Sequence, residues 1–158
     1  MDKQTKIQSY CNGNKDLDKA LKDFPQEMWA YRPTPQSWSI NQILVHLADS
    51  EANGYVRLRK IIAEPEKMII GYDQDKWADA LLYEQQDATL CLMTFKFLRT
   101  TNGELLKIIP DEVWEHYVFH DEYGKMTLYD WLDRYERHLH LHIFQMYRNL
   151  KSWEEVAN

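Results

Sequence analysis

The chain has 158 residues, of which 44% are hydrophobic and 28% are charged, so we expect a single folded domain over residues 1–158. Its net charge is −6 and it has no long basic cluster, which argues against nucleic acid as a partner, because phosphate binding needs a basic surface. No apolar stretch approaches the roughly 20 residues that cross a bilayer, and the first residues lack the apolar stretch of a signal peptide. We therefore expect a cytoplasmic protein that does not bind membranes.

The first half of the chain has the spacing of two long helices. Apolar residues at helical intervals predict a helix over residues 4 to 24, with a break or kink at Asn12-Gly13-Asn14. The second helix has the clearest start, because Ser39 is a good N-cap and Gln42, three residues later, completes a capping box. Pro65 ends this second helix.

Two long excursions interrupt the helical pattern of the second half. The first covers residues 65 to 86 and should contain a short helix at about 76 to 82. Asp87 then caps a third long helix, which Pro110 ends. The second excursion follows that proline and has an extended or hairpin-like composition.

The last helix is predicted to start at Thr127, where Asp130 replaces the usual Glu or Gln of a capping box, and to run to about Lys151. With only 5 glycines and 5 prolines, the chain is poor in the turn residues of all-β folds. The fold class is therefore all-α, a four-helix bundle with two long inter-helix excursions. Connections of this length do not require a simple up-down-up-down order of the helices.

Histidines provide the main functional signal in the sequence. His138 and His142 are four residues apart in the last helix and lie on one face, about 40° apart, whereas His140 points about 200° away. Such a pair commonly presents two imidazoles to one metal ion. The third ligand should come from another helix, and His46, on the apolar face of the second helix, is the best candidate.

Three imidazoles would leave a coordination position open for water or substrate, as in catalytic metal sites. A metal at such a site can activate water near neutral pH or bind a thiol as thiolate. Imidazole suits Zn, Ni, Fe or Cu, so the ligands alone do not identify the metal. Two other hypotheses remain open: a non-catalytic metal or small-ligand binding or sensor module, and a structural or interaction bundle whose histidines are core residues.

Three further residues could contribute to the site. Asp49 lies three positions after His46 and could hydrogen-bond an imidazole or lie on a solvated helix face. Gln145 lies on the same face as His138 and could hydrogen-bond a ligand imidazole or a bound water. His120 is the candidate catalytic acid/base in the second excursion; the alternative is an exposed loop histidine.

Three sequence blocks carry a resemblance to a known family. They are WSINQILVHLADSE at residues 38–51, GYDQDKWADALLY at 71–83 and TLYDWLDRYERHLHLHIFQMYR at 127–148. Their order and spacing are similar to those of the DinB/YfiT-like superfamily of bacterial four-helix-bundle proteins, and the likeness covers residues 17 to 148.

The resemblance implies a function as well as a fold. By position it makes His46, His138 and His142 the ligands of a divalent metal ion, usually zinc or nickel in the family, with water completing the shell. Family activities include metal-dependent hydrolysis and thiol transfer, so the implied partner is a small-molecule substrate such as a thiol. Members are often dimeric, which predicts a homodimer. His140 is an additional histidine within the family's last block.

Overall fold

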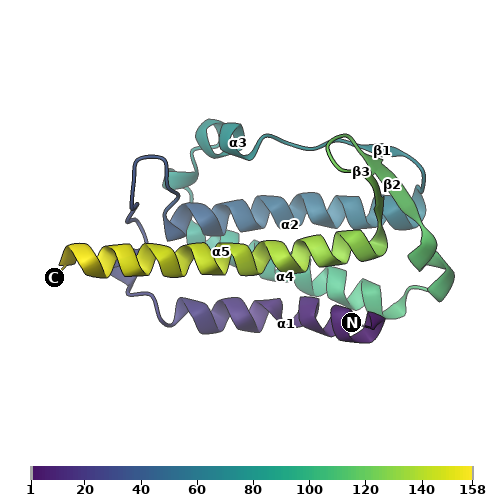
Figure 1. The fold of residues 1–158 in the computed structure, drawn as a ribbon, viewed down its shortest axis with the longest axis horizontal. Helices are drawn as coiled ribbons and strands as arrows, with labels where there is room; N and C mark the ends of the chain where they lie inside the picture. The colour runs from purple at the N-terminus through teal and green to yellow at the C-terminus, as the bar shows by residue number, and fades with distance from the viewer. Residues whose placement is uncertain (1, 158) are drawn as a thin grey trace.

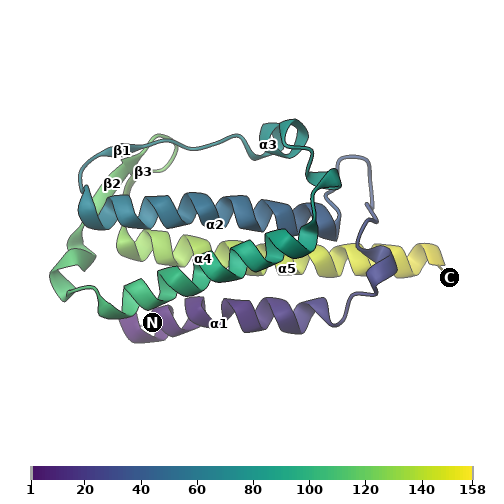
Figure 2. The same cartoon turned by 180° about the vertical axis from the view of Figure 1, so that it is seen from behind.

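The computed structural model describes residues 2–157 and has four long helices that pack lengthwise (Figure 1). The all-α four-helix-bundle prediction is confirmed. The long helices are α1 (Lys3–Leu21), α2 (Ile40–Ala63), α4 (Ala88–Ile108) and α5 (Leu128–Ala157). Helix α2 lies against α4 and α5, and α1 lies against the same two helices, as the reverse view also shows (Figure 2). Among the described residues, no helix is long and apolar enough to cross a membrane.

The helix order departs from a simple up-down alternation. Helices α2 and α4 run in the same direction, because the connection between them returns along the length of the bundle (Figure 1). That connection carries the short helix α3 (Gln74–Ala80), close to its predicted place. Three 3₁₀ turns complete the helical elements: η1 (Gln26–Met28), η2 (Tyr83–Gln85) and η3 (Asp111–Glu115).

Both predicted capping boxes are present. The Ser39 hydroxyl accepts the Gln42 N–H at 3.2 Å, and the Gln42 side chain accepts the Ser39 N–H at 2.9 Å. At α5, the Asp130 carboxylate accepts the Thr127 N–H at 2.9 Å while the Thr127 hydroxyl accepts the Asp130 N–H at 3.2 Å. These reciprocal bonds satisfy otherwise unpaired amides and fix where the two helices begin. Helix α5 continues to Ala157, beyond its predicted end at about Lys151.

A small three-stranded sheet joins the two excursions. The sequence predicted its hairpin but not its third strand. Strands β2 (Tyr117–His120) and β3 (Gly124–Thr127) form the expected hairpin. Strand β1 (Met68–Ile69), from the other excursion, pairs in parallel with β2, which places Ile69 opposite His120. The connection after α2 and the connection before α5 therefore form one wall along the bundle.

The predicted break in the first helix is wrong. Helix α1 is continuous through the Asn-Gly-Asn segment, and Gly13 is buried within it. A Cβ at Gly13 would lie 2.6 Å from Arg99 Nε and 2.7 Å from a Leu139 methyl carbon. The glycine is therefore explained by close packing of α1 against α4 and α5 and not by a turn.

Arg99 is the centre of a buried polar network that reaches all four long helices. It is 1% exposed on α4, and its Nη1 lies 3.1 Å from the Glu51 carboxylate of α2. Its Nε donates to the Tyr10 carbonyl of α1 at 3.0 Å, and Nη1 also approaches the Tyr135 carbonyl of α5 at 3.5 Å. Burial raises the pKa of Glu51 and the Arg99 charge opposes that rise. Breaking such a pair typically costs about 3–5 kcal/mol, because one charge stays buried alone.

Gly13→Ala should destabilise the protein, although alanine ordinarily favours a helix by about 1 kcal/mol over glycine. The added methyl must displace Arg99 or Leu139, and overpacking of this kind costs about 1–3 kcal/mol. Urea denaturation measures the change, with Lys15→Ala, at an exposed position of the same helix, as the control. A Gly13→Ala protein as stable as the wild type would show that this contact is not a constraint.

Candidate metal centre

Three imidazoles from two helices meet inside the bundle. His46 comes from α2, and His138 and His142 come from successive turns of α5. The Nε2 atom of His138 lies 3.1 Å from Nε2 of His46 and 3.1 Å from Nε2 of His142. One ring nitrogen from each residue lies within 4.8 Å of the other two. The structure thus brings together the three histidines that the sequence singled out.

Burial lowers the pKa of all three rings and so favours their neutral form. It lowers the pKa of His46 to about 3, with the neighbouring His142 as a smaller cause. Burial, followed by the nearby His142 and His46, holds the pKa of His138 well below its usual value. The pKa of His142 is also lowered by burial, and its hydrogen bond to Gln145 partly opposes that change. Neutral imidazoles retain the lone pairs that a metal ion requires.

Two of the three nitrogen separations are close to those expected around a tetrahedral metal ion. Two ligands with bonds of about 2.0–2.1 Å at a tetrahedral angle are separated by roughly 3.3 Å, and the observed separations of 3.1 Å are close to that value. Among the described residues, no further His, Cys, Asp or Glu joins this group. The arrangement therefore provides three protein ligands and an open position.

The surroundings of the three rings set their orientation. The Gln145 side-chain oxygen lies 3.0 Å from His142 Nδ1, so the Nδ1 proton is held there and Nε2 is left as a lone-pair donor. Trp38 lies against the site, with its ring 4.8 Å from that of His46 and stacked at 6.4 Å on that of His142. The Nδ1 atom of His46 is buried and has no partner among the described residues.

Asp49 and His140 make their contacts with residues outside the three-histidine cluster. The Asp49 carboxylate accepts the Tyr83 hydroxyl proton at 2.5 Å, which ties α2 to η2, and no described hydrogen bond joins it to an imidazole. His140 is half-exposed and lies 3.4 Å from Glu136, on the outer side of α5 where helical spacing put it. The remaining histidine, His116, contacts the backbone carbonyl of Ile62.

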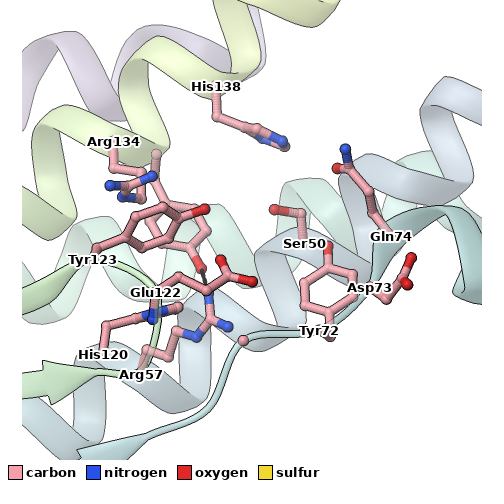
Figure 3. Close-up of a pocket in the computed structure, with 12 residues that line it drawn as sticks. Ser50, Arg57, Tyr72, Asp73, Gln74, His120, Glu122, Tyr123, Arg134 and His138 are labelled. Atoms are coloured by element: carbon pink, nitrogen blue, oxygen red, sulfur yellow. Dashed lines mark hydrogen bonds between the residues drawn. The ribbon is translucent and has the colours of Figure 1, made fainter.

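His120 is buried rather than exposed, and it lines a cavity of about 360 Å³ that also includes His138 (Figure 3). Its Nδ1 lies 3.1 Å from the Glu122 N–H, which it accepts when the ring proton is on Nε2. An Asp121 oxygen, which accepts the Gly71 N–H, also lies 3.0 Å from Nδ1. Burial, followed by the charge of Arg57, lowers the pKa of His120. Its Nε2 is buried with no partner among the described residues.

This cavity, which we call the side pocket, has two walls. In Figure 3 the side chains of Arg57, Arg134 and Tyr123 gather on one side, and Ser50 and Tyr72 lie on the other. The helices α2 and α5 supply part of the lining, and the two excursions supply the rest.

Sequence reasoning missed the two arginines of the side pocket, although a periodic signal was available. Arg134 lies four residues before His138, and Arg57 lies eleven residues after His46, so each shares a helix face with a histidine of the cluster. Charged residues at such positions are usually part of a solvated face, and only the fold shows that these two border a cavity.

Comparison with known proteins shows which proteins this chain resembles. A family model described as the DinB superfamily matches residues 13–146. A protein of Oceanobacillus iheyensis, provisionally named a metal-dependent hydrolase, is 28% identical over 126 residues, which cover 77% of this chain and 73% of that protein. YfiT of Bacillus subtilis, provisionally named in the same way, is 28% identical over 107 residues, covering 67% of this chain and 60% of YfiT.

The fold also matches a solved structure. The structure of Bacillus subtilis YfiT superposes with a TM-score of 0.86 at 23% identity, covering 96% of this chain and 87% of that one. That structure is described as having an unusual four-helix bundle topology. The likeness at this identity concerns the fold alone. Because the family model spans most of the residues, the chain belongs to the DinB superfamily.

Proposed function

We propose that this protein is a metal-dependent hydrolase whose divalent ion is held by His46, His138 and His142. The observation that carries the proposal is the convergence of three neutral imidazole nitrogens, 3.1 Å apart in two pairs, with no fourth protein ligand in the described group. The provisional names of the relatives from Oceanobacillus iheyensis and Bacillus subtilis support the same reading. By analogy with the family, the ion is zinc or nickel.

When bound, a divalent ion at this site would supply the Lewis acidity that activates water or a thiol as a nucleophile. The residues of the chain provide the remaining requirements. The three histidines hold the ion, Gln145 fixes the ring of His142, and Trp38 limits access of bulk water to two of the rings. His138 also lines the side pocket, so a substrate there would lie beside the ion.

His120 is the group we propose for proton transfer or for a hydrogen bond to the substrate. Burial and Arg57 lower its pKa, which favours the neutral ring, and its Nε2 has no partner among the described residues. It lines the same cavity as His138 but belongs to the β2 strand, so it is positioned independently of the ligands. A neutral imidazole beside a substrate can donate or accept a proton near neutral pH.

Thiol transfer is the second candidate reaction, because three imidazoles leave a position that a thiolate could occupy equally well. A sensor module would hold the metal without turnover, and a structural bundle would not hold it at all. Metal content and turnover together separate these alternatives.

Protein produced without a histidine tag should contain about one equivalent of zinc or nickel per chain by elemental analysis. Replacing His46 or His138 with Ala should remove most of it, whereas His140→Ala, which changes a histidine outside the cluster, should leave the metal content unchanged. Chelation should lower the melting temperature of the wild type, because an ion that binds only the folded state stabilises it. Metal below about a tenth of an equivalent, with melting unaffected by chelators, would favour the structural bundle.

Gln145→Leu should weaken metal binding by about 10–100-fold, because His142 loses the hydrogen bond that orients its ring. Competition with a fluorescent chelator measures the affinity. Lys151→Ala, at an exposed position of the same helix, is the control. An unchanged affinity for the Gln145 variant would show that the amide does not act on the metal site.

Metal-loaded protein should hydrolyse at least one member of a panel of small esters and amides, and His120→Gln should reduce turnover about 10²–10⁴-fold at unchanged metal content. His116→Gln, which changes a histidine against the Ile62 carbonyl, should behave as the wild type. The same protein assayed with low-molecular-weight thiols and an electrophile tests thiol transfer. Metal binding with no turnover in either panel would leave the sensor module as the better description.

A further inference from the structure

The side pocket contains two guanidinium groups that form no ion pair with a described residue. Arg57 projects from α2 and Arg134 from α5, and both line the cavity (Figure 3). Among the described residues, no carboxylate lies within salt-bridge distance of either group. Two like charges beside one partly enclosed cavity repel each other, and a bound anion removes that cost.

Contacts within the fold fix the positions of both arginines and leave some of their N–H groups without a partner. Arg57 donates from Nη1 to the Tyr135 hydroxyl at 3.3 Å and from Nη2 to the Ile70 carbonyl at 3.1 Å. A guanidinium has five N–H groups, so three of those of Arg57 are left over for a ligand. Arg134 lies over the Tyr123 ring at 3.6 Å from its centroid, which fixes its position by a cation–π contact.

The charge of the side pocket fits a monoanion better than a dianion. Two acidic residues line it, and the charge of the Asp73 carboxylate is offset by the Lys76 ammonium at 3.2 Å. Glu122 is therefore the one remaining acid of the lining, and it forms no ion pair with either guanidinium. Two positive groups and one negative group leave a charge of +1, which complements a single carboxylate.

The arginines place this anion site close to the proposed metal centre. Arg134 is one helical turn before His138, a rise of about 6 Å along α5. A carboxylate held by the two arginines would thus lie a few bonds from a group beside His138. The tyrosine rings at positions 72, 123 and 135 offer flat surfaces for the part of the molecule between them.

We propose that the side pocket recognises a small substrate through one carboxylate group, bound by Arg57 and Arg134, with the reacting bond a few atoms away beside His138. This proposal rests on the proposed function for the place of the reaction, but the anion site itself needs only the arginines. Binding can therefore be measured apart from metal and turnover.

Three probes of similar shape test the proposal: phenylacetate, phenylacetamide and benzylphosphonate. Each is titrated into zinc-loaded protein and into chelator-treated protein, and the dissociation constant is measured from chemical-shift changes in amide NMR spectra. Phenylacetate should bind about tenfold or more tightly than the uncharged amide, because charge-assisted hydrogen bonds to guanidinium are lost in the amide. It should also bind more tightly than the phosphonate, and its binding should persist without metal.

The variants Arg57→Gln and Arg134→Gln should each weaken phenylacetate binding about tenfold and leave phenylacetamide binding unchanged. Arg137→Gln, an exposed arginine of α5 outside the side pocket, is the matched control and should bind as the wild type. Arg57→Lys keeps the charge and should recover part of the affinity, and circular dichroism checks that each variant is folded.

Phenylacetate binding that is lost on chelation and is unchanged in both arginine variants would place the anion on the metal. That result would overturn the proposal. Equal binding of acid and amide, or tighter binding of the phosphonate, would also overturn it. If binding depends on the arginines in a protein that holds no metal, the anion site is supported. The proposed hydrolase function would then be contradicted.

Discussion

The contacts of Arg99 set the distances between the four long helices. Its buried guanidinium, on α4, meets the Glu51 carboxylate of α2 and backbone carbonyls of α1 and α5. Glu51 lies five residues after His46, and the α5 carbonyl belongs to Tyr135, three residues before His138. The network that anchors the bundle therefore lies within about two turns of the three-histidine cluster on both helices that carry it. The same contacts hold the two helices at the separation at which the imidazoles meet.

Preorganisation of this kind explains the electrostatics of the site. His138 lies 3.1 Å from both other imidazoles, so protonated rings would repel, and burial adds to the cost of charging them. The interior therefore favours neutral rings, each of which keeps one nitrogen lone pair. A divalent ion bound here would accept lone pairs from all three rings. The same burial gives the proposed ion a surrounding of low polarity.

The sequence predicted the helix starts and the histidine cluster because both depend on short spacings. The Ser39 and Thr127 capping boxes are local, and helical periodicity places His138 and His142 on one face. Contacts between residues far apart in the chain could not be predicted from these short spacings. The Asn-Gly-Asn segment has the composition of a turn, and only the nearby Arg99 shows why Gly13 is in a helix. The parallel pairing of β1 with β2 joins segments about fifty residues apart, so the side pocket and its arginines could not be inferred.

The pairing of Ile69 with His120 joins the two connections into one unit beside the helices. The proposed ligands belong to the helices, whereas much of the opposing lining comes from the two linked connections. Surface connections tolerate insertions and replacements far better than packed helices do. Descendants of one ancestral bundle could therefore exchange this outer wall and accept new molecules while retaining the same inner chemistry. Grafting the two connections together, as one paired unit, is the corresponding route for an engineer who wishes to redirect the protein.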